Sequence, residues 1–507
     1  MKKENFSENL ITVLKKMDGE ELAKLELFLK SPYFNRRILL VTLFDYLKKF
    51  APEFISEKYS KKNAFAEMYG DKPYNQGSIN EAYSALYRLI LKFLRQQQTE
   101  INENYQDILL LDTLKEMNLD KAFVKLSSEV EERLYSVPDT PNNLIDQYDA
   151  ILAKYNYSMG RFTKSKAKFS EEELRLGGRA FRKLILFFVT NSTSLLANSF
   201  FLSHGVNKKE SVDFSSLLNT EMINILLNGL KWDKREMILV TLYKKLFAVL
   251  KEPENEKYFE QYRKYINSNF EQIEKREVQF HFHFLMSLYI NFYKKTGNID
   301  FRFRILALRE TILFEDMYIS SFNKEFLPLS MRNIIQDYVN LQLPDRLNRL
   351  IPYVQKLSMK FRTAFTNYIK AYYHFLRGEF DDALNFALAV GNAEKRLLID
   401  MDLMRIMVFF LSGEYEHCTD KINTVKRFLN DFEEMNEEIR QNHKKFLKTI
   451  QNTIHLLESK DTAGLSVLYD DTRKNVSMIY REWYSDILSS ILQSMRSRAK
   501  RSKKKTG

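Results

Sequence analysis

The chain has 507 residues, of which 45% are hydrophobic and 28% charged, so it can bury a core and global disorder is excluded. Only 14 Gly and 9 Pro are present, a usage that favours long helices over a turn-rich sheet. The net charge is +12, and seven of these charges come from the basic residues between Arg496 and Lys505. A globally basic surface is therefore not expected.

Compartment and membrane association are indicated by the cysteine count and by the apolar stretches. The single cysteine, Cys418, excludes an intrachain disulfide and is typical of a reducing compartment. The first residues contain no apolar run of signal-peptide length. The most apolar stretch, 184–202, is interrupted by Asn, Ser and Thr, so we expect a buried pair of helices there. These features predict a soluble, cytoplasmic protein with no integral membrane segment.

Residues 1–100 are predicted to form a helical unit of their own. Asp18 followed by Glu21 is typical of a capping box that begins a helix. Hydrophobic residues at helical spacing predict further helices at about 36–50 and 61–69. Ser78 is expected to cap the helix that follows.

Residues 101–340 are predicted to form a helical array with degenerate repeats. Gly177-Gly178, Glu252-Pro253 and Gly297-Asn298 are expected to be turns within it. No segment alternates with a period of two, so no sheet is expected and the predicted fold class is all-α.

Residues 341–495 are predicted to form helical hairpins and closing helices. Gly378-Glu379-Phe380 and Gly413-Glu414-Tyr415 are matching turns, 35 residues apart, and each joins two segments with helical periodicity. This layout indicates a helical-hairpin repeat, and hence a solenoid.

The first hairpin resembles the tetratricopeptide (TPR) pattern. It has Gly378-x-Phe380-x-x-Ala383, with Ala371 seven residues before the glycine. The second hairpin keeps Gly413 but has Cys418 in place of the usual Ala. The resemblance, clear over about 345–432, implies a TPR-like solenoid in which small residues let paired helices approach closely.

Two further stretches resemble a group of uncharacterised bacterial helical-repeat proteins. They are Leu29-Lys30-Ser31-Pro32-Tyr33-Phe34-Asn35 and Arg481-Glu482-Trp483. This resemblance implies an all-helical build over most of the chain and brings no activity with it.

No catalytic, cofactor-binding or metal-binding residue is predicted, and the chain is not expected to be an enzyme. It has no Gly-rich phosphate loop and no HExxH motif. His281 and His283 would point about 200° apart on a helix, so they are expected to be structural. Cys418 occupies a packing position, which favours a buried structural thiol over a nucleophile.

Residues 496–507 are predicted to be a disordered basic tail. Fixed positive charge attracts polyanions such as RNA, DNA, ribosomes or anionic membranes, although a purely solubilising tail is an equal alternative. The candidate polyanion-binding residues are Arg496, Arg498, Lys500, Arg501, Lys503, Lys504 and Lys505.

Two functions remain open from the sequence. The first is a non-enzymatic scaffold or adaptor that binds a protein partner on the inner wall of stacked hairpins. The second is a nucleic-acid- or ribosome-associated protein that uses the basic tail and the N-terminal helical unit.

Overall fold

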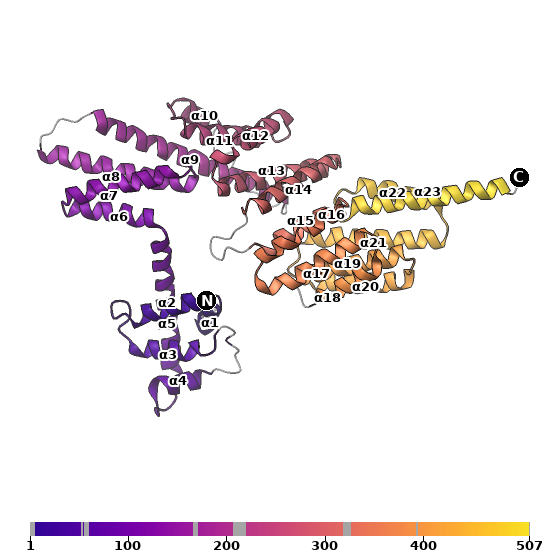
Figure 1. The fold of residues 1–507 in the computed structure, drawn as a ribbon, viewed down its shortest axis with the longest axis horizontal. Helices are drawn as coiled ribbons and strands as arrows, with labels where there is room; N and C mark the ends of the chain where they lie inside the picture. Colours follow the sequence, from indigo (N-terminus) through magenta and orange to yellow (C-terminus); the bar gives the residue numbers. More distant parts are fainter. Residues whose placement is uncertain are drawn as a thin grey trace. The chain divides into compact units, whose positions relative to one another are not determined.

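The computed structural model describes residues 6–51, 54, 60–165, 171–205, 220–317, 326–391 and 394–505. These residues are helical with connecting turns and contain no strand, so the all-α prediction is confirmed (Figure 1). The chain divides into two compact units: Met1–Val137 with Asn142–Phe187, and Pro138–Pro141 with Phe188–Gly507. The predicted domain boundaries at 100 and 340 stay predictions.

The first unit has a core made by its N-terminal helices. Asp18 forms the predicted capping box with Glu21, whereas the cap of the long α5 is Asn75 rather than Ser78. The Asn75 side chain accepts from the Ser78 N–H at 3.0 Å, so α5 begins earlier than expected. Helices α1 to α5 share one hydrophobic core, which includes Leu25, Phe44 and Leu86. The helices of this unit are α1 (Phe6–Leu14), α2 (Gly19–Lys30), α3 (Ile38–Lys48), α4 (Lys61–Tyr69), α5 (Gln76–Ile101), α6 (Glu103–Glu116), α7 (Asp120–Ser136), most of α8 (Pro141–Ser165) and the first part of α9 (Glu171–Gly205).

Helix α9 overturns two expectations. The turn expected at Gly177-Gly178 and the helix pair expected over 184–202 are wrong, because α9 runs through both without a break. A glycine inside a helix costs only about 1 kcal/mol, which tertiary packing can offset. Gly177 lies against the ring of Tyr155 on α8, so it serves close packing and does not end a helix.

The second unit is a longer succession of helices. The expected turns at Glu252-Pro253 and Gly297-Asn298 separate α11 from α12 and α13 from α14, as predicted. Its helices are the rest of α9, α10 (Thr220–Asn228), α11 (Glu236–Lys251), α12 (Glu256–Ser268), α13 (Lys275–Thr296), α14 (Asp300–Phe314), α15 (Pro328–Asn340), α16 (Pro344–Asn348), α17 (Met359–Leu376), α18 (Phe380–Ala389), α19 (Lys395–Leu411), α20 (Tyr415–Asp431), α21 (Glu437–Glu458), α22 (Thr462–Lys474) and α23 (Arg481–Lys505), with short 3₁₀ helices at Phe270–Gln272 and Ile351–Lys356.

The two glycine turns of the predicted hairpins have the same backbone geometry. Gly378 and Gly413 both have φ of +77°, a left-handed conformation that glycine adopts without steric cost. The next residue donates its N–H to a carbonyl five residues back, Glu379 to His374 at 3.0 Å and Glu414 to Phe409 at 2.9 Å. This is the Schellman motif, which satisfies the last carbonyls of α17 and α19 and turns the chain into α18 and α20.

The same turn recurs at positions without glycine. Asn118, Gln342 and Lys460 have φ between 54° and 57°, and the residue after each donates to a carbonyl five residues back. A left-handed non-glycine residue costs about 1–2 kcal/mol. These turns therefore depend on the packing of the helices that they join, α6 with α7, α15 with α16, and α21 with α22.

A buried polar network links four elements of the second unit. Arg332 of α15 donates two hydrogen bonds, of 2.6 and 2.7 Å, to the two carboxylate oxygens of Asp400 on α19. Tyr368 of α17 donates to the same carboxylate at 2.6 Å. The Tyr372 hydroxyl donates to the Asp400 carbonyl and lies 2.9 Å from the hydroxyl of Tyr480, next to α23. Burial and the adjacent carboxylate raise the pKa of Tyr368 well above 10.

The network predicts that Asp400→Ala is strongly destabilising. The substitution leaves the Arg332 guanidinium buried without its counter-charge, a change that typically costs about 3–5 kcal/mol. We expect a matching loss in the free energy of unfolding, measured by urea denaturation with circular dichroism. The control is Asp420→Ala on the exposed face of α20, expected to change it by less than about 0.5 kcal/mol. Equal unfolding midpoints for the two variants would contradict this role.

Candidate functional site

The first turn of α23 packs against the hairpin helices α17 and α19. Trp483, in the first turn of α23, packs its ring 5.8 Å from that of Phe375 on α17. Tyr484 is fully buried against α19 and α21, and Tyr480 bonds Tyr372 of α17 as described above. The first turn of α23 therefore closes part of the hairpin core, and Trp483 and Tyr484 are buried there. Binding of a partner on the inner wall of stacked hairpins stays a prediction.

A polar cleft lies beside α23, within the second unit. Its volume is about 740 Å³, within the range of roughly 300–1,000 Å³ typical of ligand-binding clefts. It is bounded by the ends of α13, α15 and α22 and by the start of α23. Charged lining residues are Lys294, Lys295, Asp470, Arg473, Lys474, Arg481, Glu482 and Asp486.

At the bottom of this cleft, the buried side chain of Arg481 is hydrogen-bonded to neighbouring protein groups. Its guanidinium donates to the carboxylate of Glu482 at 2.7 Å and to the carbonyls of Gly297 at 3.3 Å and Arg473 at 3.1 Å. Tyr293 also donates to Glu482. Burial alone would raise the pKa of Glu482, but the Tyr293 hydrogen bond and Arg481 hold it below its usual range.

The rim of the cleft carries cations that are available to a ligand, together with the exposed carboxylates of Asp470 and Asp486. Arg473 and Lys474 at the end of α22 are exposed, and no carboxylate among the described residues forms an ion pair with either. Lys294 pairs with Glu438 at 3.1 Å, and Lys295 pairs with Glu254, in exposed ion pairs. Exposed ion pairs contribute only about 0–1 kcal/mol, so a ligand carboxylate can replace either partner.

The histidine pair is split between core and surface. His281 is fully buried, with Nε2 3.0 Å from a carboxylate oxygen of Glu277 and Nδ1 2.5 Å from the Tyr262 hydroxyl. Tyr243 donates to the same oxygen of Glu277 at 2.5 Å. His283 is exposed. A neutral imidazole that donates from Nε2 and accepts at Nδ1 satisfies this network, which ties α11, α12 and α13 together.

The seven basic residues predicted to bind polyanions form the C-terminal part of α23. Core contacts of this helix end at Met495, Arg496 is exposed, and the helical backbone continues to Lys505. The helical backbone up to Lys505 differs from the expected disordered tail, because Lys, Arg and Ala are good helix formers and residues 496–506 contain no Gly or Pro. The side chains of Arg498, Lys500, Arg501, Lys503, Lys504 and Lys505 lie outside the described residues.

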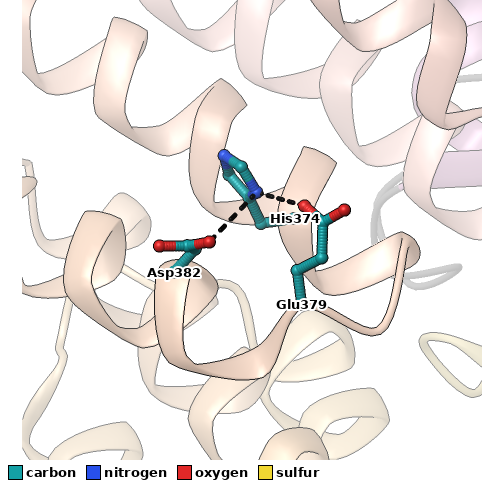
Figure 2. A group of neighbouring side chains, drawn as sticks. All are labelled: His374, Glu379 and Asp382. Carbon is teal, nitrogen blue, oxygen red and sulfur yellow. Dashed lines mark hydrogen bonds and ion pairs between the residues drawn. The ribbon is translucent and has the colours of Figure 1, made fainter.

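A cluster that the sequence did not suggest surrounds the first glycine turn (Figure 2). His374 lies in the last turn of α17, Glu379 follows the glycine, and Asp382 lies in the first turn of α18. Nδ1 of His374 is 2.6 Å from a Glu379 oxygen and 4.0 Å from an Asp382 oxygen. The other oxygen of Glu379 accepts from Arg377 at 2.9 Å, and this bond, with the His374 hydrogen bond, lowers the pKa of Glu379.

The second glycine turn contains a related but smaller arrangement. Glu414 corresponds to Glu379, and its oxygen lies 3.1 Å from Nδ1 of His417. The two turns are 35 residues apart, so the position of His374 corresponds to Phe409 and the position of Asp382 corresponds to His417. Each turn thus has a carboxylate–imidazole pair, but only the first has a third donor.

Comparison with known proteins adds no relative. The chain matches no protein-family model, no curated protein and no solved structure at a significant level. Among the described helices, none combines the length and the apolarity needed to cross a bilayer.

Cys418 is predicted to be inert in the folded protein. It is fully buried between α19 and α20, and burial raises the pKa of its thiol to about 12. The reactive thiolate is therefore almost absent at pH 8. We expect no reaction with Ellman's reagent in the native protein and one thiol per chain in urea. Rapid native labelling would show that Cys418 is accessible.

Proposed function

We propose that the protein is a non-enzymatic interaction scaffold, built from TPR-like helical hairpins, that binds an extended segment of a protein partner. Support comes from the two hairpins that share a Schellman turn, and from the small residues buried between their helices. Ala371, Ala383 and Cys418 are fully buried, in the positions that the TPR pattern reserves for close helix approach.

The polar cleft beside α23 is the partner site that we propose. The first turn of α23 packs into the hairpin core beside α17 and α19, whereas the cleft is open and large enough for several side chains. The single observation that carries the proposal is the pair of exposed cations, Arg473 and Lys474, at the edge of the cleft. The buried Arg481 below them is already neutralised by Glu482. In contrast, Arg473 and Lys474 form no ion pair with a described carboxylate. Such a rim attracts an acidic segment.

Charge reversal of the rim tests this site. We expect a randomised peptide library selected on the purified protein to yield peptides rich in Asp and Glu. Binding of these peptides should weaken at least about 10-fold in the R473E/K474E variant, since two attractive contacts become repulsive. The control is K448E on α21, which reverses an exposed charge outside the cleft and should leave binding unchanged. Peptides that bind R473E/K474E and the wild type equally would refute the site.

A second function is favoured by the basic end of α23. The helix continues past its last core contact at Met495 and carries seven basic residues and no acid. The seven cations fall within the ten residues from Arg496 to Lys505. This density of positive charge, without aromatic residues to stack on bases, favours non-specific attraction to nucleic acid over recognition of a base sequence.

The salt dependence of RNA binding tests this second function. Each contact with a single-stranded phosphate contributes roughly 0.7 to the slope of log K against log salt. Deleting residues 496–507 should therefore reduce the magnitude of the slope by up to about 5 and weaken binding at low salt. A variant in which the seven Lys and Arg residues are exchanged for one another keeps the charge and should bind as the wild type does. If deletion leaves the slope of log K against log salt unchanged, the basic segment does not bind RNA.

A further inference from the structure

We propose that His374, Glu379 and Asp382 form a binding site for a divalent transition-metal ion, of which Zn²⁺ is the probe. The three side chains come from the end of α17, the turn, and the start of α18 (Figure 2). Nothing in the proposed scaffold function requires this site. The two ideas therefore stand or fall separately.

The donor atoms are close to the spacing that an ion requires. The imidazole nitrogen and one oxygen from each carboxylate all lie within 4.8 Å of one another. In a tetrahedral site, donors held at about 2.0–2.2 Å from the ion lie roughly 3.4 Å from one another. Side-chain rotations in this partly exposed site would have to separate His374 from Glu379 and bring Asp382 closer, and water would complete the coordination.

The imidazole sets this cluster apart from ordinary acids at a helix start. Asp381, Asp382 and Glu379 are favourable at the N-terminus of α18 through the helix dipole alone. The dipole does not account for an imidazole nitrogen that faces both the Glu379 and the Asp382 carboxylates. One nitrogen with two oxygens suits Zn²⁺ and related transition metals, whereas Mg²⁺ and Ca²⁺ prefer oxygen ligands alone.

The groups around the cluster support binding of a dication. Arg377 holds one oxygen of Glu379, which orients the carboxylate and leaves its other oxygen toward His374. The two ligating carboxylates balance the charge of the ion. On binding, the ion takes the place of the proton at Nδ1 that faces Glu379, and the neutral imidazole keeps its single proton on Nε2. The ion would tie the end of α17 to the start of α18.

Zinc titration of the full chain, purified without a histidine tag, tests the site. In competition with a chromophoric chelator we expect about one equivalent of Zn²⁺ to bind. H374Q and D382N should each weaken binding at least about 10-fold, since each removes one of the three ligands. The matched control is H417Q, which alters the imidazole–carboxylate pair of the second turn and should leave zinc affinity unchanged. Protection of Cys418 from Ellman's reagent verifies that each variant is folded.

A transplant into the second turn tests whether these three donors are sufficient. F409H together with H417D places the same donors around Glu414, on a turn with the same backbone geometry. We expect the stoichiometry to rise to about two equivalents. The proposal is overturned if the wild type binds no zinc, if H374Q binds it as tightly as the wild type, or if the transplanted protein gains no site.

Discussion

The buried pair of Arg332 and Asp400 is the constraint on which the second unit depends. A charge in the core is tolerable only when its partners are all in place, and here they come from α15, α17 and α19 and from Tyr480 next to α23. Moving any one of these elements would leave a buried polar atom without its partner. Hydrophobic packing alone would tolerate small shifts between helices, whereas this network fixes their relative positions.

This network also positions the start of α23 beside the polar cleft. Because Tyr480 is held in the network, the first turn of α23 lies against the hairpins, with Trp483 and Tyr484 buried. Successive residues on a helix point about 100° apart, so Arg481 and Glu482 reach the polar cleft while the following aromatic residues enter the core. One short stretch therefore packs into the hairpin core and lines the candidate site.

Prediction from sequence worked where the signal was local and specific. The capping box at Asp18 and the turns at Gly378 and Gly413 were predicted, because few residues satisfy those backbone positions. The turns at Gln342 and Lys460 were missed, since they share the geometry without glycine and so carry no composition signal. The cluster at His374 was missed for a different reason. Its donors are five and eight residues apart, a spacing that brings them together only across a left-handed turn.

The sequence by itself determined the all-helical build and the 35-residue spacing of two hairpins, because helical periodicity and glycine turns are properties of neighbouring residues. Only the tertiary structure decided which helix covers the hairpins and which charges are buried. Asp400 meets an arginine 68 residues away, and Tyr372 meets a tyrosine 108 residues away. A buried polar group needs partners from separate helices, and no local pattern states which helices will supply them.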